Sequence, residues 1–244
     1  MAIAACALPL CVIAGTSCSY NVSFNDCEVT CAGSSACPDG LTCIQDVCRL
    51  DGNAGACAPP GSMTLRQTTD DKVDVNLKFA CTNPDQTTAD GSWYRVFSLA
   101  DAGVTTVFHV TQVTFGISTA VGSPSPHVAV KLSTYGGSFG DVHLDATKLT
   151  ALKMVDVVVP PTQITELVQA PIVADAPGNS LLVAEIATSN LMGTGDQVNI
   201  GSTDSNETHP AYLRSPLCGT TAPTTTTAAG LTGAAFVITV TGSH

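Results

Sequence analysis

Cysteine is the residue type with the most chemistry to offer in this chain, because 11 of its 244 residues are Cys. Six of them are separated by short gaps rich in small and polar residues: Cys27, Cys31, Cys37, Cys43, Cys48 and Cys57. Zinc ribbons and thioredoxin-like redox centres need Cys-x-x-Cys pairs, and this group contains none. Because this segment is short and has too little apolar surface to form a core of its own, we expect disulfides to hold it together. The spacing does not select one pairing among the many that six Cys permit.

Two further Cys, Cys81 and Cys218, lie far apart in the long C-terminal part of the chain. In an oxidising compartment, two Cys residues that are the only ones in a domain usually form a disulfide. We therefore expect a bond between them that ties an early strand to the loop before the last strand. Since a bond that closes a long loop restricts the unfolded chain, it would contribute strongly to stability.

Residues that could act as acids, bases or nucleophiles are scattered rather than gathered in motifs. The sequence has no Gly-x-Ser-x-Gly elbow, no His-Glu-x-x-His motif and no phosphate-binding Gly loop before a helix. His109 lies inside an apolar run and is expected to be a packed or sheet-face residue. His143, near Asp141 and Asp145, could form one corner of a metal site, although no second His is near it in sequence. Glu185 interrupts an apolar strand, which predicts either a solvent-facing carboxylate or a buried acid with a partner.

Residues 189–207 are rich in the oxygen atoms that Ca²⁺ prefers as ligands. The candidates are Asn190, Asp196, Gln197, Asn199, Asp204, Ser205, Asn206 and Glu207. The spacing is not that of an EF-hand, so the stretch is either a structural Ca²⁺ loop or a solvated turn region. Apart from this Ca²⁺ candidate the sequence predicts no cofactor, and it assigns no catalytic, cofactor-binding or metal-ligating residue.

The start of the chain has the features of an export signal. Residues 2–15 are almost wholly apolar, too short to span a bilayer and typical of the core of a signal peptide. The usual positive start is missing, because no Lys or Arg precedes Arg49. Cleavage before Cys18 would leave a Cys that carries a lipid anchor; Ser17 fits such a processing site, whereas Gly15 does not. Lipidation at Cys18, plain secretion and a buried helix of the mature protein are the three interpretations.

The elements that must position these side chains are mainly short strands. Two β-rich runs, 92–99 and 107–117, hold the only Trp and are expected at the centre of the core. Turn residues separate these two runs from other apolar or alternating runs, which are 73–79, 128–132, 236–240, 155–159 and 181–186. Of these, 155–159 and 181–186 are expected to be central strands. A single helical turn is expected near 145–149. This pattern predicts an all-β fold, an antiparallel β-sandwich.

The same pattern divides the chain into four parts: a signal-like segment (1–17), a Cys-rich disulfide module (18–57), a linker (58–62) and a β-sandwich domain (63–244). Charged residues make up 12%, which is half the usual share of about 25%. The net charge of −11 excludes the basic surface that nucleic-acid binding requires and disfavours contact with anionic membranes. Together with the Cys content, this composition predicts an extracellular protein.

Two segments carry a resemblance to known proteins. The run from Cys31 to Arg49, with Cys37-Pro38-Asp39-Gly40-Leu41-Thr42-Cys43 at its centre, resembles Cys-rich segments of secreted and outer-membrane lipoproteins of Gram-negative soil bacteria. This resemblance implies a location at the bacterial cell surface, either free or anchored to the outer membrane. Residues 89–242 resemble a β-sandwich module of bacterial secreted proteins that is similar in outline to galactose-binding-like jelly rolls. The matching segments include 93–97, 110–116, 128–132, 181–185 and 218–223. Such modules are usually non-catalytic adhesion or anchoring domains.

Two functions therefore compete. The first, which we favour, is a surface-displayed binding, adhesion or structural module without enzymatic activity, whose partner is a polysaccharide or another cell-surface component. Its aromatic residues Trp93, Tyr94, Tyr135 and Tyr212 would either stack on sugar rings or belong to the core. The second is a secreted glycosidase-type hydrolase that uses Glu185 and an acid from a neighbouring strand. An inhibitor role for the Cys-rich module is a minor third hypothesis, and the sequence does not specify the oligomeric state.

Overall fold

The computed structural model describes residues 37–38, 40–44, 47–50 and 62–244. The chain forms two compact units, Met1–Cys57 and Ala58–His244. The signal-like segment and four of the predicted Cys positions (Cys18, Cys27, Cys31 and Cys57) lie outside the described residues. No helix in the part of the chain that the structure describes is long and apolar enough to cross a membrane.

The described part of the first unit is an antiparallel hairpin of β1 (Leu41–Ile44) and β2 (Val47–Leu50). A disulfide joins Cys37 to Cys48, and Cys43 is also disulfide-bonded. Gly40, at a φ of 86°, occupies the left-handed region in the turn that leads into β1, as expected for glycine in a tight turn. Disulfides of this kind persist in oxidising compartments, so they indicate an extracellular, non-cytoplasmic protein.

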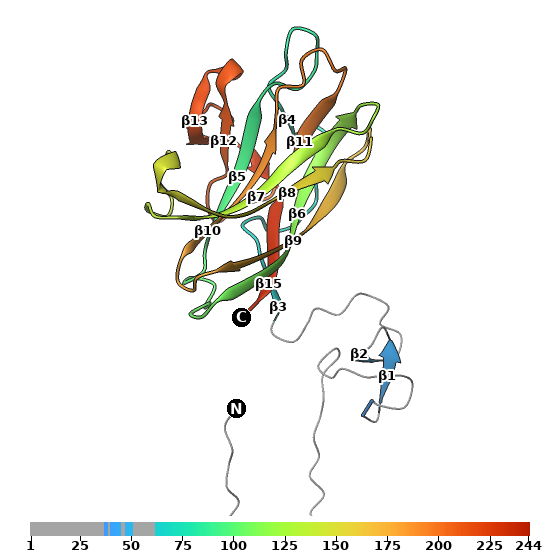
Figure 1. Ribbon diagram of the computed structural model, residues 1–244, viewed down its shortest axis with the longest axis vertical. Coiled ribbons are helices and arrows are strands. Elements are labelled where there is room, and N and C mark those ends of the chain that lie inside the picture. Colours follow the sequence, from blue (N-terminus) through green and yellow to red (C-terminus); the bar gives the residue numbers. More distant parts are fainter. Residues whose placement is uncertain (1–36, 39, 45–46, 51–61) are drawn as a thin grey trace, which may run out of the picture. The chain divides into compact units, whose positions relative to one another are not determined.

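The second unit confirms the predicted all-β architecture: two antiparallel sheets stacked on a common core (Figure 1). One sheet has the order β13 (Thr220–Thr225), β12 (Tyr212–Ser215), β5 (Gly91–Ser98), β10 (Leu181–Thr188), β7 (His127–Tyr135) and β8 (Leu149–Val158). The other has the order β14 (Ala235–Phe236), β11 (Gln197–Thr203), β6 (Phe108–Val121), β15 (Ile238–Ser243) and β3 (Ser62–Leu65), with β4 (Lys78–Phe79) paired to β11 and β9 (Glu166–Ala176) paired to β6. The helical turn expected near 145–149 is the 3-10 turn η1 (Ala146–Lys148), and a second turn, η2 (Pro216–Cys218), follows β12.

The two β-rich runs expected at the centre become β5 and β6, and each is an interior strand of a different sheet. Trp93 and Phe97 project from β5 into the space between the sheets, where they belong to the same buried cluster as Phe115 and Ile117 of β6. Burial of such large apolar side chains is the main favourable contribution to folding. The edge strands of the second sheet differ in length: β4 and β14 have two residues each, whereas β9 has 11.

The alternating run 73–79, predicted to be a strand, is one only at Lys78–Phe79, so this prediction was wrong for most of its length. The reason is local. The Asp74 side chain accepts a hydrogen bond from the backbone N–H of Asn76 at 2.7 Å, and the N–H of Leu77 donates to the Asp74 carbonyl at 3.2 Å. Asp side chains commonly stabilise turns in this way, and here the turn replaces the extended conformation.

The run 155–159 was predicted to be a central strand, but it lies in β8 at the edge of the six-stranded sheet. Its outward side chains are accordingly exposed: Met154 at 61% and Val158 at 54%. Val155 and Val157 pack against the main core from the other side of the strand, which explains why an edge strand is so apolar. The hydrophobic pattern therefore identified the strand but not its place in the sheet.

Val73 remains buried despite the lost strand, because it packs against two glycines of the neighbouring strands. A Cβ atom at Gly201 would lie 2.3 Å from one methyl carbon of Val73, and a Cβ atom at Gly116 would lie 2.6 Å from the other. We expect Gly201→Ala to lower the free energy of unfolding by about 1–3 kcal/mol through overpacking. Urea unfolding would measure this loss. Adding Val73→Ala should recover part of it, and equal stabilities of wild type and Gly201→Ala would contradict the account.

Candidate functional site

The outer face of the six-stranded sheet gathers polar side chains by simple alternation along its strands. On β5, Trp93 points inward and Tyr94 outward; on β10, Ile186 points inward and Glu185 outward. The register of the sheet places Glu185 directly opposite Tyr94 on one side and opposite Lys131 of β7 on the other. Residues that are far apart in sequence therefore form a single row across the sheet.

A depression of about 560 Å³ lies on this face and crosses β12, β5, β10, β7 and β8. Its floor contains small residues, namely Ser92, Ala129 and Ala187. This volume falls within the range of about 300–1,000 Å³ that is usual for ligand sites. The strands that form the depression can be followed in Figure 1, where β5, β10, β7 and β8 lie next to one another.

Two ion pairs and one hydrogen-bonded His–Asp pair surround this floor. Lys131 Nζ lies 3.0 Å from a carboxylate oxygen of Glu185, and Arg214 of β12 lies 3.0 Å from Asp90. His127 Nδ1 lies 2.5 Å from the carboxylate of Asp156 at the far side of the sheet.

The three pairs differ in exposure, with the Glu185 side chain 14% exposed and the Asp156 side chain 66% exposed. Exposed pairs such as His127–Asp156 contribute only about 0–1 kcal/mol to stability, so stability alone is a weak reason for their place on this face.

Tyr94 provides a hydroxyl group at the centre of the depression. Burial raises the pKa of Tyr94 well above its usual range, and the negative charge of Glu185 raises it further. A hydrogen bond with Ser92 opposes this shift of the pKa. Tyr94 therefore keeps its proton at physiological pH and remains a hydrogen-bond donor.

A second depression continues from the first, because Tyr94, Glu185 and Arg214 line both. It extends past His143 and Leu149 toward the first residues of β13, Thr221 to Pro223. We call the two depressions together the trough. Neighbouring strands lie about 4.8 Å apart, so the first depression alone, across five strands, extends for roughly 19 Å.

The single histidines considered in the sequence lie apart from one another. His109 is a sheet-face residue of β6, as expected, and its Nδ1 atom lies 2.7 Å from Asp175. His143 is hydrogen-bonded to Thr224 at 3.0 Å. The two acids near it have other partners: Asp141 accepts from the Tyr135 hydroxyl, and Asp145 accepts from the backbone N–H of Thr147. Within the described residues, no group of three or more His, Cys, Asp or Glu side chains is placed to hold a metal ion.

The oxygen-rich stretch 189–207 does not form one loop, because Gln197–Thr203 is strand β11. Asn190, before the strand, accepts a hydrogen bond from the Asn83 side chain at 2.8 Å. Glu207, after it, pairs with Arg95. The candidate Ca²⁺ ligands are therefore divided between separate places.

The four aromatic residues that could have stacked on sugar rings belong to the core instead. Trp93, Tyr94, Tyr135 and Tyr212 are only 1–5% exposed. Tyr94, Tyr135 and Tyr212 form a small cluster with Leu144 behind one end of the trough, and burial raises the pKa of Tyr212 to about 12. The trough therefore offers hydrogen-bonding groups rather than an exposed aromatic platform.

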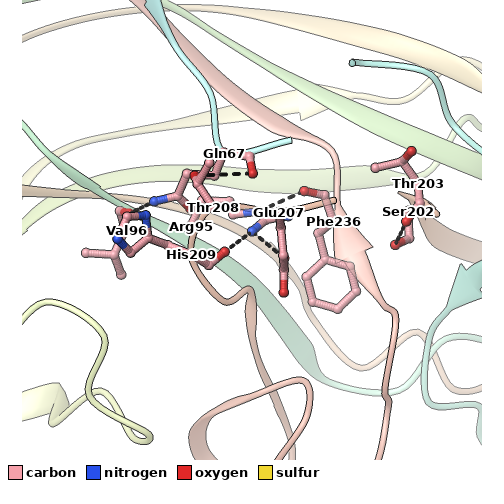
Figure 2. Close-up of polar contacts among 9 residues, drawn as sticks. All are labelled: Gln67, Arg95, Val96, Ser202, Thr203, Glu207, Thr208, His209 and Phe236. Carbon is pink, nitrogen blue, oxygen red and sulfur yellow. Dashed lines mark hydrogen bonds and ion pairs between the residues drawn. The ribbon is translucent and has the colours of Figure 1, made fainter. Parts of the chain in front are cut away.

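Arg95 is the polar residue that the sequence analysis missed. It is fully buried on the inward side of β5, and Figure 2 shows its guanidinium group between three acceptors. It donates to the carbonyls of Phe236 and His209, both at 2.9 Å, and to the carboxylate of Glu207 at 2.8 Å. Burial lowers the pKa of Arg95, while Glu207 opposes this shift. Because Phe236 belongs to the opposite sheet, the Arg95 cluster joins the two sheets.

The Arg95 position did carry a signal in the sequence. In Trp93-Tyr94-Arg95-Val96-Phe97, Arg95 shares the side of the strand with Trp93 and Phe97, which marks it as inward-facing. Beside it, the Gln67 side chain donates to the carbonyl of Val96 (Figure 2). These contacts are with the protein's own backbone and with Glu207, so we interpret the Arg95 cluster as structural.

Comparison with known proteins gives no family: no family model and no curated protein matches the sequence. One solved structure with a similar fold is that of the clostridial cysteine protease Cwp84 after propeptide cleavage, with a TM-score of 0.50 and 9% sequence identity. The match covers 81% of this chain and 45% of that protein, so this chain spans less than half of it. At this identity the likeness shows the fold alone. The Cys residues of the described part, Cys37, Cys43, Cys48, Cys81 and Cys218, are all disulfide-bonded.

Proposed function

We propose that this protein is a non-catalytic extracellular binding module that holds carbohydrate in the trough. The observation that carries this proposal is the set of three acid–base side-chain pairs around a floor of small residues: Asp90–Arg214, Glu185–Lys131 and Asp156–His127. A sugar hydroxyl both donates and accepts hydrogen bonds, and each pair presents a donor and an acceptor side by side. The charges of Asp90 and Glu185 are balanced by those of Arg214 and Lys131, which suits a neutral ligand.

The three pairs also orient the side chains before a ligand arrives. Each charged group is held by its partner, so less side-chain entropy is lost when a ligand binds. Hydrogen bonds to charged groups are stronger than those between neutral groups, at about 1.5–3 kcal/mol each. The small floor residues allow a sugar ring to approach the sheet closely. The length of the trough suits several consecutive units of a polysaccharide at the cell surface.

The acids of the trough also motivated the alternative of a glycosidase. That reaction requires one carboxyl group that delivers a proton and a second that acts from the other side of the bond. Asp90, Asp156 and Glu185 each face a basic side chain, which is an arrangement for holding a ligand rather than for delivering a proton. We therefore propose binding without hydrolysis.

The test is a comparison of Arg214→Ala with His109→Ala. A glycan array followed by calorimetry on the best polysaccharide should show binding by the wild type. Loss of a charged donor in the trough should weaken binding about tenfold or more, from the value of a charged hydrogen bond. His109→Ala removes a similar exposed pair from the other sheet and should bind as the wild type does.

The outcomes separate the two functions. Failure of the wild type to bind any polysaccharide, or equal weakening in both variants, would contradict the proposal. A reducing-end assay on the same polysaccharides covers the alternative. Release of new ends by the wild type, lost in Glu185→Gln, would show a hydrolase instead.

A further inference from the structure

A crevice of about 400 Å³ opens at one edge of the sandwich, where the Cys81–Cys218 disulfide bridges the two sheets. Cys81 lies two residues after β4, which belongs to the seven-stranded sheet. Cys218 ends η2, between two strands of the six-stranded sheet. The strands β4 and β12 at this edge are short and leave the edge open. The disulfide and the connection between β13 and β14 close it only in part.

The walls of the crevice are mainly apolar and continuous with the main core. Trp93 and Leu213, which are opposite one another on β5 and β12, form one wall. Phe79 forms another and packs edge-on against Phe236 with the ring centroids 5.7 Å apart. Leu231 closes the outer side. All of these residues belong to the main core or pack directly against it.

Two polar features stand out against these apolar walls. Ser215 is 6% exposed, lines the crevice, and has a hydroxyl group without a hydrogen-bond partner. Lys78 is exposed and is the one charged residue among the described residues that line the crevice. A concave apolar pocket with a few polar groups is the usual form of a small-molecule site.

We propose that this crevice binds a free single-chain amphiphile with an apolar tail and an anionic head, such as a fatty acid. The tail lies against Trp93, Phe79 and Leu231 and removes these surfaces from water. The carboxylate lies near Lys78, the one cation at the opening. A cationic head would meet Lys78 unfavourably, although the protein as a whole has a net charge of −11. This site is separate from the trough and does not depend on carbohydrate binding.

The single Trp of the chain makes this site directly measurable, because all Trp fluorescence comes from the wall of the crevice. Titration of the full chain with laurate, below its micelle concentration, should change the intensity of the Trp93 emission and saturate, because Trp93 is already buried and only its contacts change. Lys78→Ala should weaken laurate binding about twofold to fivefold, the effect of an exposed ion pair, and leave the binding of dodecanol unchanged. Ala229→Phe should fill the crevice and abolish the saturable change in Trp93 emission.

Circular dichroism of each variant would establish that it is folded. Unchanged Trp93 emission in the wild type would overturn the proposal, and so would equal laurate affinities of the wild type and both variants. Binding to anionic phospholipid vesicles in place of laurate would overturn the assignment to a free amphiphile. Ala229→Phe should bind polysaccharide as the wild type does. Failure of amphiphile binding in the crevice would therefore not contradict carbohydrate binding in the trough, and the reverse also holds.

Discussion

Replacing both Cys81 and Cys218 by Ser is expected to lower the free energy of unfolding of the sandwich by about 4–5 kcal/mol. The two residues are 137 positions apart, and a bond that closes so long a loop removes much conformational freedom from the unfolded chain. The bond also joins the two sheets at an edge where β4 has only two residues. Guanidinium unfolding of the oxidised wild type and the double variant, followed by Trp93 fluorescence, would measure the difference.

The Cys37–Cys48 bond provides a matched control. It closes a loop with a sequence separation of 11 in the first unit, so its removal should leave the unfolding of the sandwich unchanged. Identical unfolding midpoints for the wild type and the Cys81→Ser/Cys218→Ser variant would contradict the expectation. A thiol titration of the unfolded, unreduced protein gives an independent check, since reactive thiol at both positions would mean that the bond does not form.

Glu207→Gln is expected to lower the free energy of unfolding by about 3 kcal/mol. Arg95 is fully buried, and Glu207 is the one carboxylate that faces its guanidinium among the described residues. Removal of one partner of a buried ion pair typically costs about 3–5 kcal/mol, because the other charge stays buried without compensation. The lower end applies here, since the Glu207 side chain is 26% exposed. Urea unfolding at neutral pH would measure the loss.

Two companion variants separate this effect from a general loss of surface charge. Asp175→Asn breaks the exposed pair with His109 and should change the free energy of unfolding by less than about 1 kcal/mol. Arg95→Met with Glu207→Gln removes the buried charge altogether and should be more stable than Glu207→Gln alone, as apolar replacements of buried pairs often are. If Glu207→Gln were no more destabilising than Asp175→Asn, the Arg95 cluster would not join the sheets in the way we describe.

Residue patterns in the sequence predicted part of the candidate site. The presence of a charged residue inside an apolar strand predicted that Glu185 would face solvent or be a buried acid with a partner, and the structure places it on the outer face with Lys131 as its partner. The partner could not be named in advance, because it depends on β10 pairing with β7 in a particular register. The Arg214–Asp90 pair could not be named in advance either, because its two residues lie in separate parts of the chain.

The two wrong predictions, for the runs 73–79 and 155–159, have different causes. The run 73–79 alternates as a strand should, yet the turn formed by Asp74 competes with the extended conformation. The run 155–159 is as apolar as a central strand, yet β8 has a neighbour on one side only. In the first case a side chain changed the backbone conformation, and in the second the order of strands in the sheet determined exposure.

The sequence by itself determined the all-β class, the presence of disulfides and the central place of β5 and β6. These properties follow from composition and from the two-residue period of a strand, which each segment carries on its own. Only the tertiary structure decided that β5 and β6 lie in different sheets, that Arg95 is paired with Glu207, and that three acid–base side-chain pairs meet in the trough. Each of these depends on pairings between segments more than 25 positions apart or on the stacking of whole sheets, and no local period specifies such partners.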